Sequence, residues 1–359
     1  MPAVMSRPPR TRRPARSPRS AGAAVPGTDE QAARYATAYH APVLAAETVA
    51  GLVTDPAGLY VDGTLGGGGH SAALLDALGP DALVVGIDQD AEALGTARAR
   101  LADAEAAGRF VALRGNFADM AALLDAAGLG PNHGRPAAGV LLDLGVSSRQ
   151  LDAPARGFAF MSDGPLDMRM DGQNGETAAD LIDRLTETGL ADTIYTYGEE
   201  GRSRRIAQAI KAAPRMETTA DLAAAVRASV PTREEGKALA RVFQALRIAV
   251  NDEMDVLERA LPAALDVLAP GGRLAVIAYH SLEDRRAKHF LRTGRFEADV
   301  EKDAFGRPLT PFVAVTRRAV VATEAETARN GRARSARLRI AEKAADGPRP
   351  EPPERPSGA

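Results

Sequence analysis

The sequence predicts an α/β fold, a doubly wound parallel sheet that carries an inserted all-helical segment. Strand-like and helix-like segments alternate through residues 42–143, and a glycine-rich run at residues 61–70 joins the first strand to a helix. Residues 151–238 then break the alternation and show helical patterns without convincing strands. Regular alternation of strands and helices places a parallel sheet between two layers of helices.

The first half of the chain contains short apolar runs, each preceded by a segment with helical periodicity. The expected helices cover residues 42–53, 69–78, 90–105 and 118–127. The expected strands cover residues 58–62, 83–87, 109–113 and 138–143. Because these strands are expected to be parallel, their carboxyl ends should meet at one edge of the sheet, where ligands bind in such folds.

The pattern resumes late in the chain. An apolar helical face runs from Leu239 to Val250, and a second helix is expected at residues 252–268, ending at a Pro-Gly-Gly turn. The remaining expected strands are a buried one at residues 274–279 and two strand-like runs at 311–321 and 336–341. We expect these last two runs to close the sheet as an antiparallel hairpin.

We interpret residues 151–238, which break the alternation of strands and helices, as an all-helical insertion between the fourth and fifth strands. Its expected helices cover residues 177–188, 190–195, 203–212 and 219–228. Thr218 and Asp221 have the spacing of a capping box at the start of the last of these helices. The chain is therefore divided into a sheet domain of residues 37–150 and 239–343 and a helical insertion of residues 151–238.

Both ends of the chain are expected to be disordered. Residues 1–36 are rich in arginine, proline and serine, and they contain too little apolar surface for a core. They lack the apolar segment of a secretory signal, and Arg12-Arg13 is not a twin-arginine signal. An inert tail and an arm that contacts RNA phosphates are both open for this segment. Residues 344–359 form a second, proline-rich tail.

The composition excludes several kinds of site and protein. The chain has 359 residues and no cysteine, which excludes disulfides, thiolate metal sites and cysteine nucleophiles and fits a reducing cytoplasm. No apolar stretch approaches the length of a membrane helix, so we expect no membrane association. The net charge is −2, so any binding of nucleic acid must come from local basic patches.

The glycine-rich run predicts a site for a nucleotide-like ligand, because glycine lets the backbone approach closely and adopt positive φ. Asp88 follows the next strand, at the interval where a carboxylate binds ribose hydroxyls. Asp62 opens the run, and its charge would oppose a pyrophosphate but suits the sulfonium and ammonium of S-adenosylmethionine. The tetraglycine also departs from the spacing of a dinucleotide site. S-adenosylmethionine is therefore favoured over NAD, and a surface turn without a ligand is the third interpretation.

Other polar groups are expected at the same edge of the sheet. Asp143 ends the fourth strand and should face both cofactor and substrate, with capping of the next helix as its alternative role. Phe117 follows the third strand and offers an apolar face for an adenine, although core packing explains it almost as well. His280 and Ser281 follow the fifth strand, where Ser281 also suits a helix cap. We expect no metal at His280, because no second histidine or carboxylate pair stands at metal-ligand spacing.

Two interpretations are open for each of three charged segments: a functional role, or a solvent-exposed surface without one. The loop at residues 163–171 is dense in charge and methionine, as functional loops often are. Two arginine clusters have the composition of phosphate-binding patches in a chain that is otherwise near neutral. The clusters are Arg202, Arg204 and Arg205, and Arg329, Arg332, Arg334, Arg337 and Arg339.

Taken together, the motifs resemble those of the ribosomal RNA small subunit methyltransferase H family, the 16S rRNA cytosine-N4 methyltransferases. The resemblance covers roughly residues 38–343 and rests on long motifs in a fixed order. The motifs are residues 40–44, 62–70, 142–148, 150–152, 156–158, 163–171, 197–200, 243–248, 280–285 and 332–335.

The resemblance implies a Rossmann-like S-adenosylmethionine-dependent methyltransferase sheet whose helical insertion recognises the substrate. The implied reaction is N4-methylation of a cytosine in 16S rRNA at the ribosomal decoding centre, and the implied partner is that RNA or the small ribosomal subunit particle. A homodimer is implied on the same ground. The implied cofactor contacts are Gly68, Gly69, His70, Asp88, Phe117, Asp143 and Gln150.

For catalysis, Asp143 is our first candidate to accept the amino proton, and His280 and Ser281 are the second. Many amino-methylating enzymes end this strand with Asp-Pro-Pro-Tyr, whereas here Asp143 is followed by Leu144, so a stacking aromatic group must come from elsewhere. Two alternatives stay open: a methyltransferase of the same fold acting on a different substrate, and a non-catalytic RNA-binding assembly factor.

Overall fold

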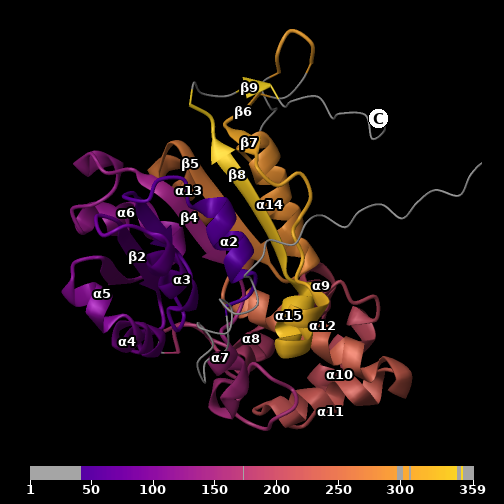
Figure 1. Cartoon of the computed structure of the whole chain (residues 1–359). Coiled ribbons are helices and arrows are strands. Elements are labelled where there is room, and N and C mark those ends of the chain that lie inside the picture. Colours follow the sequence, from indigo (N-terminus) through magenta and orange to yellow (C-terminus); the bar gives the residue numbers. More distant parts are fainter. Residues whose placement is uncertain (1–41, 173, 297–301, 307–308, 346–348, 351–359) are drawn as a thin grey trace, which may run out of the picture.

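The computed structural model describes residues 42–172, 174–296, 302–306, 309–345 and 349–350 (Figure 1). The predicted arm at residues 1–36 lies outside these residues, as does most of the tail predicted at 344–359. In the part of the chain that is described, no helix combines the length and apolar character that a membrane span requires.

A seven-stranded sheet forms the centre of the molecule, in the order β3-β2-β1-β4-β5-β8-β7. The first five strands in this order are parallel, and β8 and β7 complete the sheet in antiparallel orientation. Their bounds are β1 Leu59–Asp62, β2 Leu83–Asp88, β3 Phe110–Arg114, β4 Ala137–Asp143, β5 Leu268–Ala278, β7 Phe312–Ala314 and β8 Arg337–Lys343. The predicted doubly wound α/β fold is thereby confirmed. A two-stranded ladder pairs β6 (Leu309–Thr310) with β9 (Arg349–Pro350).

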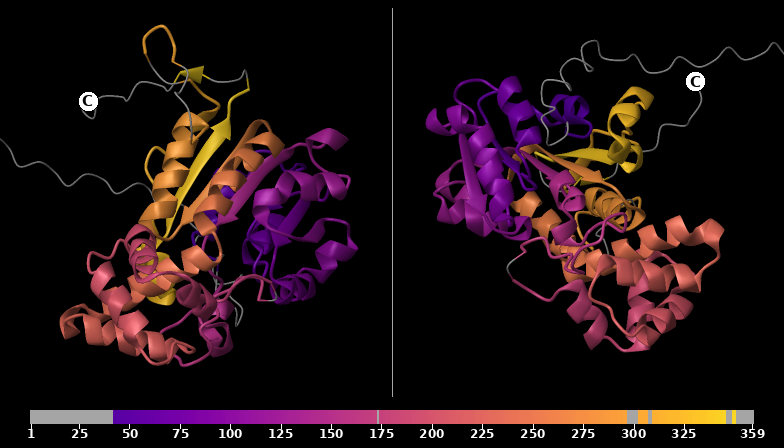
Figure 2. Two further views of the ribbon diagram at one scale, coloured as in Figure 1. Left: turned by 180° about the vertical axis from the view of Figure 1, so that it is seen from behind. Right: turned by 90° about the horizontal axis from the view of Figure 1, so that it is seen from below.

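Helices cover both faces of the sheet, and residues alternate between the faces as the strand pleat requires (Figures 1 and 2). Val61 packs with one layer of helices, whereas its neighbour Tyr60 packs with the other. The first layer contains α6 Met120–Ala126, α13 Glu253–Val267 and α14 Ser281–Thr293. The second contains α2 Ala45–Leu52, α3 Gly69–Ala77, α4 Ala91–Arg100 and α5 Ala102–Ala106.

The helical insertion has a hydrophobic core of its own and lies beyond the carboxyl edge of the sheet (Figure 1). Its helices are α7 Ser148–Asp152, α8 Ala178–Arg184, α9 Glu187–Gly198, α10 Ser203–Ala212, α11 Thr219–Ser229 and α12 Glu235–Val250. Leu239, Val242, Phe243 and Leu246 of α12 belong to this core rather than to the cores of the sheet. We therefore propose that the insertion extends through α12, beyond the expected boundary at residue 238.

Several predicted elements differ from the observed ones, and the helix expected at residues 90–105 is divided into α4 and α5 at Leu101. The helix expected at residues 177–188 ends at Arg184, because Thr186 caps a new helix and accepts a hydrogen bond from the Gly189 amide. The Pro-Gly-Gly turn at residues 270–272 forms an irregularity within β5, opposite a register shift in β4. Only Phe312–Ala314 of the run 311–321 is a strand, and α15 (Glu324–Arg329) separates it from β8.

The crossing of α9 and α12 yields a stability prediction. A methyl group added at Gly198 would lie 2.6 Å from the Arg241 carbonyl oxygen of α12. We expect Gly198→Ala to lower the free energy of unfolding by about 1–3 kcal/mol, because overpacking displaces the two helices. Urea unfolding of the full chain measures this change.

Gly236→Ala is the matched control. It lies in α12 with nothing within 4 Å of the added group. It should leave stability unchanged or raise it by about 0.5–1 kcal/mol, because alanine is the better helix former. Equal losses in both variants would contradict the packing argument.

Candidate active site

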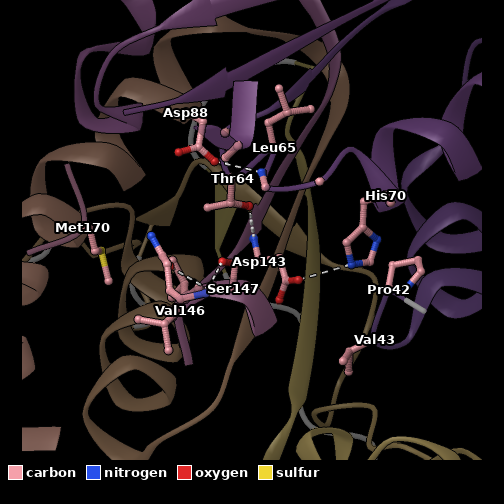
Figure 3. Close-up of a pocket in the computed structure, with 18 of the residues that line it drawn as sticks. Pro42, Val43, Thr64, Leu65, His70, Asp88, Asp143, Val146, Ser147 and Met170 are labelled. Carbon is pink, nitrogen blue, oxygen red and sulfur yellow. Dashed lines mark hydrogen bonds and ion pairs between the residues drawn. The ribbon is translucent and has the colours of Figure 1, made fainter. Parts of the chain in front are cut away.

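A cavity of about 370 Å³ opens at the carboxyl ends of β1, β2 and β4 (Figure 3). The sheet order reverses between β1 and β4, which is where ligands bind in open α/β sheets. The volume lies within the range of small-molecule sites. Of the predicted cofactor contacts, the cavity is lined by Gly69, His70, Asp88, Phe117, Asp143 and Gln150.

The glycine loop between β1 and α3 is held by a buried carboxylate. Asp62 is fully buried, and it accepts hydrogen bonds from the Thr64 amide (3.2 Å) and the Ser71 hydroxyl (2.7 Å). Burial raises the pKa of Asp62 above its usual range. Asp62 is absent from the cavity lining, so it shapes the loop and does not face the ligand directly.

Gly68 also shapes the glycine loop. It is the N-cap of α3, with φ of +75°, a conformation that favours glycine. A side chain at this position would meet Ala97 and Leu101, and the residue does not line the cavity. Gly68 therefore supports the fold of the loop, and the cofactor contact that the resemblance implied for it stays a prediction.

Asp88 reaches the cavity from the end of β2. It accepts hydrogen bonds from the Gly66 amide (2.8 Å) and the Asp90 amide (2.9 Å), which ties β2 to the glycine loop. Burial raises its pKa to about 6, despite these two amides. Its oxygens have lone pairs left to accept hydroxyl donors from a ribose.

Asn116 and Phe117 line the neighbouring end of the cavity, at the end of β3. The Phe117 ring is half-buried, so one side of it is available to a flat ligand. Gln150 enters from α7, where its Oε1 atom accepts a hydrogen bond from the Ser147 amide at 2.9 Å. Capping of α7 therefore fixes the orientation of Gln150.

Asp143 is the centre of a hydrogen-bonded group (Figure 3). Its amide donates to the Thr64 hydroxyl (2.7 Å), and its Oδ1 atom accepts from the Tyr279 hydroxyl (2.8 Å). His70 Nε2 lies 3.4 Å from Asp143 Oδ2. Burial alone would lower the pKa of His70, but Asp143 and Asp62 outweigh burial and raise it. The site thus presents a carboxylate that a tyrosine and a histidine orient.

His280 and Ser281 lie outside the cavity lining, so the structure does not place them beside Asp143. His280 Nε2 lies 3.1 Å from Glu283 Oε1 at the start of α14. The Ser281 hydroxyl donates to Glu199 Oε2 at 2.6 Å and thereby joins α14 to the end of α9. Ser281 therefore joins the sheet domain to the helical insertion, and the role of His280 and Ser281 as second catalytic candidates stays a prediction.

His280 lies beside a cluster of carboxylates, and the spacing of these residues in the sequence did not reveal this cluster. Ligand atoms of Glu253, His280 and Glu283 lie within 4.8 Å of one another, an arrangement that can hold a metal ion. The Arg247 guanidinium donates to both Glu253 oxygens at 2.7 and 2.8 Å. Burial would lower the pKa of Arg247, but Glu253 raises it on balance. The positive charge that a cation would bring is therefore already supplied by Arg247.

The loop at residues 163–171 pairs two of its charged residues with each other, whereas Asp163 and Asp171 bond to residues outside it. Asp167 pairs with Arg169 at 2.8 Å, and only Met170 of this loop lines the cavity. Arg156 connects the loop to the sheet domain, because it donates to the Met170 carbonyl (2.8 Å) and to Asp90 Oδ2 (2.9 Å). The loop thus contributes Met170 to the cavity wall, and Arg156 links the backbone of the loop to the sheet domain.

The arginine clusters are only partly exposed. Arg202 pairs with Glu234, Arg339 pairs with Asp284, and Arg332 pairs with Asp152. Exposed arginines of the two clusters are Arg202, Arg204, Arg205, Arg329, Arg334 and Arg337. A charge run in the sequence therefore contributes both ion pairs within the fold and exposed positive charge.

Sequence reasoning did not identify Tyr279 and Thr64, which form hydrogen bonds with Asp143. Tyr279 ends the fifth strand at the same edge as Asp143, and that position was the available signal. Thr64 belongs to the glycine-rich run itself. The contact of both with Asp143 depends on the pairing of β4 with β1 and β5.

Comparison with known proteins agrees with this architecture. The model of the MraW methylase family matches residues 37–344. Ribosomal RNA small subunit methyltransferase H of Chlorobaculum parvum is 50% identical over 316 residues, covering 85% of this chain and 98% of that protein. The Deinococcus radiodurans protein of that name is 49% identical over 329 residues, covering 90% and 96%. A match of this extent to the family model and to such relatives shows that the chain belongs to the MraW methylase family.

Proposed function

We propose that this protein transfers a methyl group from S-adenosylmethionine to the exocyclic N4 of a cytosine in 16S rRNA, at the decoding centre of the small ribosomal subunit. The observation that carries the proposal is the cavity lined by both Asp88 and Asp143, which end β2 and β4 on either side of β1. Membership of a methylase family and the name of the relatives, ribosomal RNA small subunit methyltransferase H, support methyl transfer and an RNA substrate.

The residues of the cavity fit the proposed cofactor. Asp88 would accept the ribose hydroxyls, and Phe117 with Asn116 would contact the adenine. The glycine loop and His70 would surround the methionine end. S-adenosylmethionine supplies an electrophilic methyl group on a positively charged sulfur, and the Asp143 carboxylate provides a complementary charge beside it.

Asp143 is also the proposed acceptor for the substrate amino group. The lone pair of N4 is delocalised into the cytosine ring, so an acceptor on the amino hydrogens localises it. As N4 forms its bond to the methyl carbon, the carbon–sulfur bond breaks and N4 releases one proton towards the acceptor. Tyr279 and His70 hold the Asp143 oxygens in place, which favours rate enhancement by positioning.

Tyr279 is in addition an aromatic side chain in the cavity wall. No aromatic residue follows Asp143 directly, so another residue must stack on the target base. We assign this contact to Tyr279. A cytosine must leave its stack to reach this wall, as for other base-modifying enzymes.

The partners and location complete the proposal. We assign the helical insertion and the exposed arginines to binding of the surrounding RNA, as naked rRNA or in the subunit particle. A cytoplasmic homodimer is proposed on the family resemblance.

Transfer of a labelled methyl group to small-subunit RNA or particles, followed by nucleoside analysis, tests the reaction and the modified atom together. We expect label in N4-methylcytidine. Asp143→Asn should lower turnover by about 10²- to 10⁴-fold, the range for loss of a proton-transfer group. Label in another nucleoside would contradict the assignment of N4, and wild-type turnover in Asp143→Asn would remove Asp143 from catalysis.

The raised pKa of Asp88 predicts pH-dependent binding of the cofactor product, S-adenosylhomocysteine. An ionised carboxylate is the better acceptor for ribose hydroxyls, so affinity should fall as the pH drops through about 6. Calorimetry should give about tenfold weaker binding at pH 5 than at pH 8. Asp88→Asn should bind weakly with a flatter profile, and a flat profile in the wild type would contradict this role.

The exposed Arg334 predicts a salt-dependent contribution to RNA binding. Arg334→Ala should weaken binding and lower the slope of log affinity against log salt by about one unit, because one phosphate contact is lost. Affinity for S-adenosylhomocysteine should stay unchanged. Unaltered RNA binding across salt concentrations would exclude Arg334 from the interface.

A further inference from the structure

A donor of Arg332 in the cavity wall has no acceptor in the part of the chain that the structure describes. Arg332 lies in the short 3-10 helix η5 (Gly331–Ser335) and lines the cavity. Its Nη2 atom donates to Asp152 Oδ1 at 2.8 Å, which fixes the guanidinium against α7. Its Nη1 atom is buried and has no hydrogen-bond partner among the described residues. Leaving a buried charged donor unsatisfied costs free energy, so the site points to an anionic or polar ligand atom.

The segment that carries Arg332 is anchored to the glycine loop. Ala333 is fully buried and packs in the same core cluster as Leu65 of the loop and Leu44. The Leu44 amide donates to Glu326 of α15 at 2.7 Å, just before η5. A side chain at Gly69 would touch Pro42 at 3.3 Å, so the chain around Leu44 lies directly against the loop.

These contacts place Arg332 away from the nucleoside end of the cavity. Asp88 and Phe117 lie at the ends of β2 and β3, whereas η5 leads into β8, beyond β4 and β5 in the sheet. A cofactor whose ribose lies at Asp88 extends its other end past the glycine loop. That end of S-adenosylmethionine carries a carboxylate, and a guanidinium is the side chain best suited to bind one.

We propose that Arg332 binds the carboxylate of the cofactor's methionine moiety through its guanidinium. The inference rests on the proposed function, since it assumes S-adenosylmethionine in this cavity. The position of Arg332 in the cavity wall favours this carboxylate over an RNA phosphate. A small ligand carries its carboxylate into the cavity, whereas a phosphate is tied to the RNA backbone on both sides.

The test compares two ligands that differ in the methionine moiety. S-adenosylhomocysteine contains the carboxylate, and methylthioadenosine has the same nucleoside and a thioether but no amino-acid group. Arg332→Gln should weaken binding of S-adenosylhomocysteine by about 10- to 100-fold, the effect of losing a charge-assisted hydrogen bond. Binding of methylthioadenosine should change by less than about threefold, within the spread of a neutral surface change. Calorimetry on the full chain measures both.

Two control variants separate a direct contact from a general effect. Arg337→Gln removes an exposed arginine from the adjoining β8 and should leave both affinities unchanged. Asp152→Asn removes the ion-pair partner but keeps the guanidinium, and it should retain the preference for S-adenosylhomocysteine. Loss of that preference in Asp152→Asn would assign the effect to the ion pair and overturn the proposal.

The remaining outcomes are distinct. Equal weakening of both ligands in Arg332→Gln would indicate a structural role and overturn the proposal. Unchanged binding of both ligands, with weaker and less salt-dependent RNA binding, would assign Arg332 to an RNA phosphate and also overturn it. If the wild-type chain bound neither ligand, the proposed cofactor itself would be wrong, whatever the variants did.

Discussion

A buried carboxylate at the end of the first strand is the constraint on which the site depends. Asp62 is fully enclosed, and its two oxygens are occupied by the Thr64 amide and the Ser71 hydroxyl. A buried charge without partners would be costly, so the loop must fold so as to supply them. Once it does, Gly66 lies within reach of Asp88 and Thr64 within reach of Asp143. The glycine loop thereby connects three strand ends into one rigid wall.

The chemistry proposed for the cavity follows from how that wall presents Asp143. Tyr279 and His70 approach its two oxygens from β5 and α3, and the loop threonine holds its backbone. An acceptor held in this way needs little reorganisation when a substrate amino group arrives. The same contacts explain why a weak nucleophile such as an aromatic amine does not require a strong base here.

The helical insertion is joined to the sheet by charged and polar contacts at the rim of the cavity. Arg156 spans from Asp90 to the backbone of Met170, and Asn251 bonds the backbone of Met168 and Met170. Ser281 and Glu199 form a second connection. The insertion has its own apolar core, so these contacts set its position relative to the site. Under the proposed function, a substrate bound to the insertion would be held near Asp143.

The sequence by itself determined the parallel sheet, the glycine loop, and the positions of Asp88 and Asp143, because periodicity and strand-end position are local properties. It also predicted an all-helical insertion, although the apolar face of α12 gave no sign of which core it would join. Only the tertiary structure decided that Asp62 and Gly68 do not line the cavity, that Ser281 joins α14 to the end of α9, and that Tyr279 meets Asp143. These outcomes depend on which strands pair and which charges find partners. Tyr279 and Asp143 are 136 residues apart, and Ser281 and Glu199 are 82 apart, so no local sequence pattern records these contacts.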